Sequence, residues 1–476
     1  MRSLIYIASF SLFVVSITSC KKYLDVNTNP NQPNRATING LLTRVTENTA
    51  LNVYRVSTNI TSYYVQYLAS SNTASPLDTY DDVDGSTTWT NLYDNMTDIY
   101  DLEKVAADRG AIQYRGVAKV LMAMNLQYVH SLWGDAPYSK AFNLSTLTPA
   151  YDNAQSLFQS CLQLLDEGIT LLNEQNPPYP IPGESGSSRS PDLIHKGNAQ
   201  AWIRTAHALK ARLLNQLSKT NQYNTNVIFG ELAAAYTSND HDAFVSTWDV
   251  RNPWNQVAVN NRNLLLDGWL SEQFIDAMNG KTYGVFDPRL PLMTDTTKYG
   301  DYRGTPNGKG RSGSGVSFEE TYINLTGFYS SSNSPVFIIT YDELKFIEAE
   351  AAFRANNKPR AYAAYLEGIN ANMNKMKVAA ANRDAYVNHA SVSVGETNLT
   401  LDHIFKEKYK ALFLNPESWN DARRYNYQYK DFTLPLNAVA GNFIRRMVYP
   451  SVETSRNGAN VPPGITDVTQ RFWWDL

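Results

Sequence analysis

The sequence predicts a mainly α-helical protein in which helical hairpins pack against a loop-rich half with little β-structure. Two observations lead to this prediction. Apolar residues recur every three or four positions over long stretches, which is typical of amphipathic helices. Between these stretches lie long segments that are rich in glycine, proline and aromatic residues. The expected helices cover roughly residues 38–70, 89–107, 112–132, 151–174, 199–218, 341–355, 359–377 and 401–414.

The stretch 112–132 has the clearest helical pattern. Its apolar residues form one stripe, and further apolar residues lie beside that stripe, so the helix is expected to be buried on more than one face. The stretch 199–218 carries a similar stripe. The first stripe is Tyr114, Val117, Leu121, Met124, Tyr128 and Leu132, and the second is Trp202, Ala206, Leu209, Leu213 and Leu217.

A helical hairpin is expected between residues 341 and 377. Thr340 and Glu343 have the spacing of a capping box at the start of the first helix. Residues 356–359 predict a tight turn, with Pro359 as the first residue of the second helix. Small residues allow the two helices to approach closely, and such pairs are typical of tetratricopeptide-like hairpins, although no clean period of about 34 residues marks a repeat. These small residues are Ala349, Ala351, Ala352, Ala361, Ala363 and Ala364.

The N-terminus has the pattern of a bacterial lipoprotein. A basic start and an apolar run from Leu4 to Ile17 predict a signal peptide over residues 1–19, and Cys20 follows where cleavage and acylation are expected. An ordinary signal peptide that ends by chance at a cysteine is the alternative. Residues 20–37 are polar and predict a flexible tether, and residues 38–476 are expected to form a single domain.

Cleavage and acylation of Cys20 would leave Cys161 as the only free thiol of the mature chain. It falls in step with apolar residues of the helix expected over 151–174, so we expect the thiol to be buried in packing and unreactive.

Three long irregular segments are expected, over roughly residues 71–88, 176–199 and 237–335. Loops of this length are uncommon in compact domains unless they are functional or disordered. The third segment is rich in tryptophan and tyrosine, which argues against disorder. Its glycines allow the chain to turn sharply and to pack closely against a ligand.

The sequence contains no recognisable catalytic or metal-binding motif. The six histidines lack the spacing of a metal site, and no cofactor or metal is expected. The acids of the first loop fail the calcium-loop register and predict a solvated acidic turn in preference to a metal site; they are Asp78, Asp81, Asp82 and Asp84. With 42 Lys and Arg against 45 Asp and Glu, the net charge of −3 offers no basic field for nucleic acid.

Five segments together resemble the SusD/RagB family of outer-membrane nutrient-binding lipoproteins, and fit its second SusD-like group best. They run in family order from the expected anchor almost to the C-terminus. The segments are CKKYLDVNTNP (20–30), LWGDAPY (132–138), PVFIITYDELKFIEAE (335–350), LFLNPESWNDARR (412–424) and IRRMVYP (444–450), with Glu453 and Asn457 following.

The resemblance implies tetratricopeptide-like hairpins packed against a loop-rich ligand-binding half. It implies lipid anchoring in the outer membrane, on the outer face, with a SusC-type TonB-dependent transporter as partner. The implied ligand is an oligosaccharide, or a peptide in some members. Within the quoted motifs we expect structural roles for a set of buried groups: Trp419, Asp421, Arg423, Arg424, Arg445, Arg446 and Tyr449.

Candidate ligand-binding residues follow from the position of the family's binding loops. Aromatic planes cover the apolar faces of sugar rings, while polar side chains satisfy the hydroxyl edges. Each candidate has a core role as its alternative, and this alternative is weakest for the three tyrosines that lie among glycine and serine. The candidates are Tyr80 and Trp89 from the first loop and Trp248, Trp254, Tyr299, Tyr302 and Tyr329 from the third.

These features favour a non-enzymatic binder that captures a nutrient and delivers it to the transporter. A lipid-anchored glycoside hydrolase is one alternative, which would place two carboxylates close together in an aromatic cleft. A helical-repeat scaffold that binds only proteins is the other, and it leaves the aromatic loops without a function.

Overall fold

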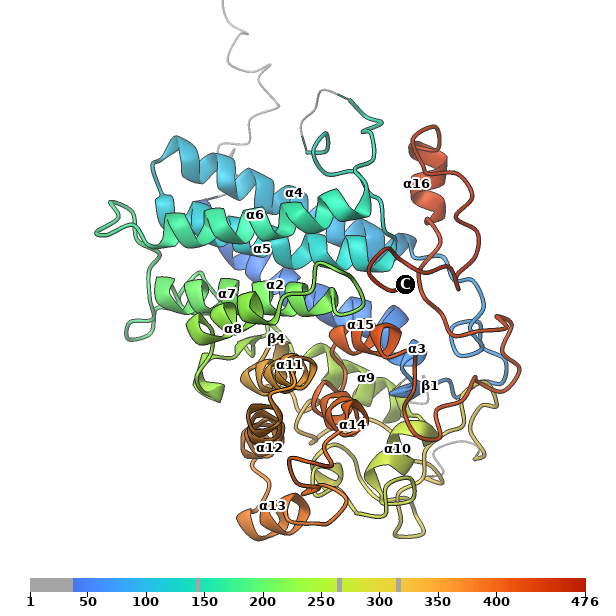
Figure 1. Cartoon of the computed structure of the whole chain (residues 1–476). Helices are drawn as coiled ribbons and strands as arrows, with labels where there is room; N and C mark the ends of the chain where they lie inside the picture. Colours follow the sequence, from blue (N-terminus) through green and yellow to red (C-terminus); the bar gives the residue numbers. More distant parts are fainter. Residues whose placement is uncertain (1–36, 143–145, 263–267, 314–317) are drawn as a thin grey trace, which may run out of the picture.

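The computed structural model describes residues 37–142, 146–262, 268–313 and 318–476. The predicted mainly α-helical fold with little β-structure is confirmed. Figure 1 shows helical hairpins stacked from α4 and α5 at the top to α12 and α13 at the bottom, with shorter elements and long loops on the right. The predicted signal peptide 1–19 and the attachment site at Cys20 lie outside the described residues and stay predictions.

The long helices follow one another along the chain. They are α2 (Ile38–Val56), α4 (Ser86–Asp108), α5 (Ile112–Leu132), α6 (Ala154–Leu172), α7 (Ala199–Gln216), α8 (Thr225–Ala234), α11 (Tyr341–Arg354), α12 (Lys358–Lys375), α13 (Ala380–Val387) and α14 (Leu401–Ala411). Shorter helical pieces are η1 (Ser57–Thr61), α3 (Ser62–Tyr64), η2 (Asn239–His241), α9 (Pro253–Arg262), α10 (Glu272–Met278), η3 (Leu290–Leu292), α15 (Glu417–Arg424) and α16 (Ser451–Arg456).

Helix α5 is the most deeply buried helix of the stack, as its pattern predicts. Every residue from Val120 to Leu132 is buried. The helix can lie this close to α6 because glycines face each other where the two cross: a Cβ on Gly116 would meet Leu172, and one on Gly168 would meet Val120. Larger residues at this crossing would force the helices apart.

The hairpin of α11 and α12 forms as expected, but two local predictions are wrong. Thr340 makes no capping hydrogen bond, and Asp242 accepts the amide of Tyr341, the first residue of α11, at 2.7 Å. Glu343 instead forms a buried ion pair with Arg212 at 2.6 Å. Pro359 is the second residue of α12 and not the first.

The segment 237–335 is not irregular throughout, which corrects the sequence prediction. It contains α9, α10 and two short strands. Strand β2 (Ala243–Val245) pairs antiparallel with β4 (Val336–Ile339), and β1 (Leu68–Ala69) pairs antiparallel with β3 (Trp269–Leu270). These pairings fasten the loop-rich half to the end of α3 and to the start of α11.

A buried ionic cluster joins the loop-rich half to the helices. Arg289 is fully buried and donates to Asp287 at 2.6 and 2.9 Å. It also donates to Glu407 of α14 and to Asn372 of α12, each at 2.9 Å. A buried charge is tolerated only when its partners satisfy it in this way. The guanidinium therefore holds the third loop against two helices.

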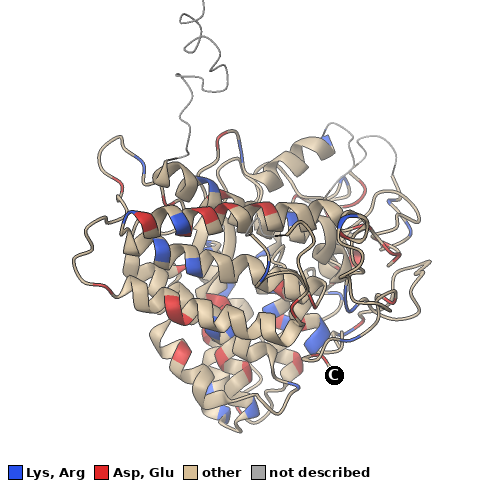
Figure 2. Cartoon of the chain, turned by 90° about the horizontal axis from the view of Figure 1, so that it is seen from above, with Lys and Arg blue, Asp and Glu red and all other residues tan. Residues whose placement is uncertain are grey.

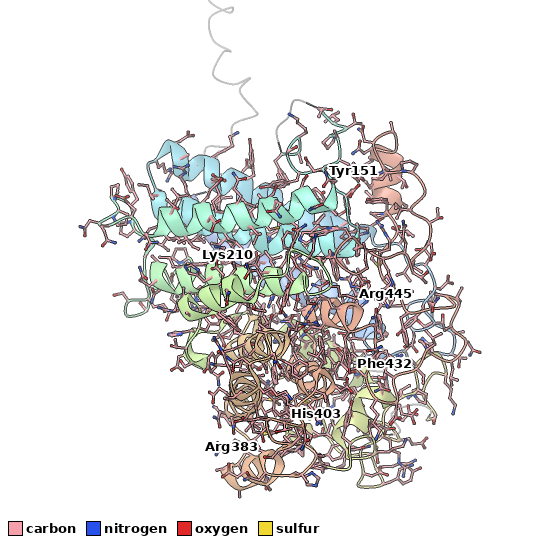
Figure 3. All side chains as sticks on the ribbon, viewed as in Figure 1. Tyr151, Lys210, Arg383, His403, Phe432 and Arg445 are labelled. Atoms are coloured by element: carbon pink, nitrogen blue, oxygen red, sulfur yellow. The ribbon has the colours of Figure 1, made fainter. Side chains whose placement is uncertain are left out.

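The residues of the C-terminal motifs have the structural roles expected of them. Arg424 pairs with Glu350 of α11 at 2.7 Å and with Asp421 at 2.6 Å. The Arg423 guanidinium lies 3.8 Å from the centre of the Trp419 ring. Arg445, Arg446 and Tyr449 are likewise buried within the fold, and Figure 3 labels Arg445 beside α15.

Cys161 is buried, as predicted, and burial raises the pKa of its thiol.

Lys and Arg are interspersed with Asp and Glu along the helices instead of gathering into one basic face (Figure 2). Among the described residues, no helix has both the length and the apolar character that crossing a membrane requires.

Two buried carboxyl groups make the stability of this fold depend on pH. Burial raises the pKa of Asp242 to about 7, beside Asp342 and against the opposing charge of Lys375. Burial also raises the pKa of Glu417 to about 7, against the opposing effect of Arg212. Folded protein therefore binds protons in a range where unfolded carboxyls are ionised.

We expect these two groups to add to the free energy of unfolding as the pH falls from about 8 to about 6, by about 1 kcal/mol each. Urea denaturation across this range measures the free energy of unfolding. Asp242→Asn should remove the part of its pH dependence that comes from Asp242. A slope that Asp242→Asn leaves unchanged would contradict the assignment; the total slope also contains the opposite contribution of two buried imidazoles, because burial lowers the pKa of His130 to about 3 and that of His195 to about 4.

Candidate functional site

Two of the predicted site residues, Tyr80 and Trp89, lie in the core. Tyr80 is 1% exposed, and its hydroxyl donates to the Tyr64 carbonyl at 3.0 Å. Trp89 stacks on Tyr93 at 4.7 Å between ring centres and meets Trp133 edge-on at 4.9 Å. Trp89 does line a hollow of about 270 Å³ between α4 and α16, but the rings there cover one another's faces.

Three further candidates also pack inside the loop-rich half. Trp254 meets Tyr54 edge-on at 4.8 Å, and Tyr329 lies 5.4 Å from the Phe413 ring. Both are buried and line an internal cavity of only about 30 Å³. Trp248 is half-buried, and its indole N–H donates to the Ser334 carbonyl at 3.1 Å. These three rings therefore serve packing in this structure.

The last two candidates, Tyr299 and Tyr302, both line a surface hollow of about 520 Å³ beside α10. Tyr299 is 56% exposed, the most exposed of the seven candidates. The hollow is otherwise lined mostly by polar groups: Glu272, Asp276, Asn279, Lys281, Arg303, Gly304, Pro306, Lys309, Ser312, Glu319 and Glu320.

A second hollow, of about 370 Å³, adjoins the first and shares Glu272, Asp276, Lys281 and Pro306 with it. We call the two together the α10 groove. Figure 3 labels Phe432, which lies between α15 and α10 in that view and belongs to the segment that closes the second hollow. The residues that line only this second part are Gln66, Gln273, Thr282, Asn307, Asp431, Thr433, Leu434, Pro435 and Leu436.

Tyr299 is held on a tight turn at the mouth of the α10 groove. The Thr297 carbonyl accepts the Gly300 amide at 2.9 Å, and the Thr297 amide donates to the Asp301 carbonyl at 2.7 Å. The Arg303 guanidinium lies 4.5 Å from the centre of the tyrosine ring, which restrains the ring by a cation–π contact. The Lys298 ammonium also lies 5.1 Å from the ring centre, and the tyrosine remains 56% exposed.

The polar groups of the α10 groove are arranged for hydroxyl groups. Glu272 and Asp276 lie one helical turn apart on α10, and the Lys281 ammonium lies 3.8 and 2.6 Å from their carboxylates. Glu320 accepts from the Thr305 hydroxyl at 2.6 Å and from the Ser312 hydroxyl at 2.9 Å. Carboxylates with spare lone pairs and an amine can both accept from and donate to a sugar.

Short backbone pairings fix the segments of the α10 groove to one another. The Thr321 amide donates to Arg303 at 2.7 Å, and the Leu270 amide donates to Thr321 at 3.1 Å. The Thr305 amide donates back to Leu270 at 2.8 Å. The groove walls therefore rest on β3 and not on free loops.

The acids of the first loop are dispersed instead of clustered. Asp78 is fully buried, which corrects its prediction as part of a solvated turn. Asp84 accepts from Ser86 and Ser451 and so ties the start of α4 to the start of α16. Within the described residues, no group of three or more His, Cys, Asp or Glu side chains is placed to hold a metal ion.

The carboxylates of α10 are the main site residues that the sequence reasoning missed. A signal for α10 was present: Ser271 is a capping residue that accepts the Gln273 amide at 3.2 Å, and Phe274, Ile275 and Met278 have helical spacing. Tertiary structure places α10 beside Tyr299, and no sequence pattern predicts this arrangement.

The comparisons with known proteins agree with this fold. A family model described as "Starch-binding associating with outer membrane", SusD-like 2, matches residues 30–450. No curated protein matches the sequence.

Several solved structures share the fold. One is a chitin-binding SusD homologue from Flavobacterium johnsoniae, with a TM-score of 0.76 at 20% identity and coverage of 92% of this chain and 98% of that chain. A SusD/RagB family protein from Bacteroides thetaiotaomicron has a TM-score of 0.74 at 20% identity, with coverage of 93% and 99%. A SusD homologue from Bacteroides fragilis has a TM-score of 0.72 at 22% identity, also with coverage of 93% and 99%.

The family model spans most of the chain, and the helical stack with its loop-rich half matches these structures along almost their whole length. The resemblance that the sequence motifs indicated is thereby confirmed. The chain belongs to the SusD-like family of outer-membrane-associated proteins, in its SusD-like 2 group.

Proposed function

We propose that the protein binds neutral oligosaccharides in the α10 groove and leaves them chemically unchanged. The single observation that carries the proposal is the exposed Tyr299 ring, which stands with Tyr302 at the mouth of a polar groove. The chitin-binding protein among the similar structures supports a glycan built of hexosamine or hexose units as the ligand.

Binding would divide between ring faces and ring edges. The apolar face of a sugar would lie on Tyr299, while its hydroxyl groups would bond to Glu272, Asp276 and Asn279. Because the groove is open, much of the ligand stays in water and the affinity is expected to be modest. A modest affinity suits a protein that must release its ligand.

The proposal places the protein on the outer face of the outer membrane. Acylation of Cys20 would anchor it there through more than one acyl chain, which gives stable attachment. The partner is a SusC-type TonB-dependent transporter, to which the ligand is delivered. A shared membrane raises the effective concentration of the two proteins, so even a weak contact between them persists.

Replacing Tyr299 by alanine tests the ring's role. We expect Tyr299→Ala to weaken binding about tenfold, since a stacked aromatic contact contributes about 1 kcal/mol beyond buried area. Isothermal titration calorimetry with chitin-derived and starch-derived oligosaccharides measures the change.

The matched control is Tyr179→Ala, because Tyr179 is also 56% exposed but lies outside the groove lining. Affinity that falls equally in both variants, or in neither, would contradict the placement of the ligand. New reducing ends during incubation would favour a lipid-anchored glycoside hydrolase instead.

A further inference from the structure

Asp78 is a buried carboxylate that lies behind the wall of the α10 groove. It is fully buried, and its two oxygens accept from different groups of one turn. The Asn307 side-chain amide donates to one oxygen, and the Gly308 backbone amide donates to the other, each at 2.6 Å. Hydrogen bonds to an ionised carboxylate are short and strong, as these are.

Asn307 connects the Asp78 carboxylate to three segments around the groove. Its side-chain N–H₂ also donates to the Leu68 carbonyl of β1 at 2.9 Å, and its side-chain oxygen accepts from the Ser271 hydroxyl at 2.6 Å. Its backbone carbonyl accepts from the Leu436 amide at 2.9 Å. Asn307 therefore joins β1 and the start of α10 through its side chain, and the segment 433–436 through its backbone.

The turn at residues 306–308 depends on Asp78 because both donors point at it. Protonation turns one accepting oxygen into a hydroxyl, a weaker acceptor, and an amide in place of the carboxyl presents a donor toward one of these two N–H groups. That group then stays buried without an acceptor, which is unfavourable. The turn can relieve this only by moving away, and Pro306 and Asn307 would move with it.

The surroundings of Asp78 allow it to titrate near neutral pH. Burial raises the pKa of its carboxyl to about 6, although the hydrogen bonds from Gly308, Asn307 and the Ser70 backbone act in the opposite direction. The nearby titratable groups are Tyr80 and Tyr64, and burial raises the pKa of both phenols far above this range.

The charged groups on the facing turn do not pair with Asp78. Lys309 is exposed, and the Arg311 guanidinium lies 5.4 Å from the centre of the Trp269 ring. Asp81 and Asp82 follow on its own loop and belong to the exposed side of that loop, where Asp81 accepts the Asp82 amide.

We propose that ionised Asp78 is a positioning residue of the α10 groove, and that its protonation releases the 306–308 turn and weakens ligand binding. The inference rests on the proposed function, because it assigns a control to the same groove. Ligand capture would then be strongest above neutral pH and would decline in mildly acidic surroundings.

The experiment measures oligosaccharide affinity from about pH 7.5 to about pH 5 in the full mature chain and in two variants. The unaltered protein should lose affinity about tenfold as the pH falls through the titration of Asp78. Asp78→Asn should be about tenfold weaker at pH 7.5 and should show little further change. Asp82→Asn is the control, and it should keep the profile of the unaltered protein.

A second readout does not need a ligand. Hydrogen exchange at the Gly308 amide, corrected for the intrinsic effect of pH, should be slow at pH 7.5 and faster below the pKa of Asp78 in the unaltered protein. The pKa of Asp78 is higher in the folded state than the ordinary value of 3.8, so its protonation stabilises the fold. Loss of affinity without any fall in melting temperature therefore separates the turn's release from unfolding.

Two results would overturn the proposal: an affinity profile in Asp78→Asn that matches the unaltered protein, or a Gly308 amide whose exchange ignores both pH and substitution. If no oligosaccharide binds at any pH, the proposed function fails, and the Gly308 exchange still decides whether Asp78 positions the turn.

Discussion

Arg289→Met is expected to lower the free energy of unfolding by about 3–5 kcal/mol, the largest effect of any substitution considered. The guanidinium is fully buried between Asp287 and Glu407, and its removal leaves carboxylates in the core with less compensation. Breaking one side of a buried ion pair typically has a cost of this size. Chemical denaturation of the two proteins measures the difference.

The chain supplies a matched control for this substitution. Arg303 pairs with Asp301 through the same Asp-x-Arg spacing, but its side chain is 53% exposed. Arg303→Met should therefore change stability by less than about 1 kcal/mol, as is typical of surface pairs. Equal effects of the two substitutions would show that the buried cluster does not hold the third loop against α12 and α14.

Gly308→Ala is expected to have the second largest effect, and it acts on the groove itself. A Cβ at Gly308 would lie 1.8 Å from the Leu436 carbonyl oxygen, which is backbone and cannot swing aside. We expect a loss of about 2–3 kcal/mol of stability beyond the backbone strain, together with weaker oligosaccharide binding. Thermal unfolding and calorimetry measure the two effects.

Gly395→Ala is the control, because Gly395 has the same φ of +79° and nothing within 4 Å of the added atom. Both variants place alanine in the left-handed region, so the difference between them isolates the contact with Leu436. If Gly395→Ala is as damaging as Gly308→Ala, strain alone explains the loss and the close approach has no role.

The long helices could be predicted from the sequence because their patterns are strong. The observed bounds of α5 coincide with the predicted stretch 112–132, where nearly every position is apolar or buried. Helices α9 and α10 could not be predicted in the same way, because they are short and partly polar. Packing within the loop-rich half determines them more than local propensity does.

The candidate site was predictable only in part. Aromatic residues in loops can serve a core or a ligand, and the local sequence around Tyr80 and Trp254 does not separate these roles. Tyr299 differs because it lies in a turn between Lys298 and Gly300, with no apolar neighbour to pack it inside. The restraint by Asp78 joins it to Asn307, 229 positions away along the chain, so no local pattern reports it.

The start of α11 is another feature that the local sequence does not predict correctly. The spacing of Thr340 and Glu343 fits a capping box, yet Thr340 makes no capping bond and Glu343 has a better partner elsewhere in the fold. Asp242 reaches the free amide at the start of α11, and Arg212 captures Glu343 in the core. Tertiary ion pairs of buried groups outweigh a local cap of about 1 kcal/mol.

A crystal structure of the mature protein with a bound oligosaccharide tests the central claim most directly. We predict an intact glycan in the α10 groove, with a sugar ring on Tyr299 and its hydroxyl groups bonded to Glu272 or Asp276. A glycan bound elsewhere, such as the hollow between α4 and α16, or one found cleaved in the groove, would contradict the account.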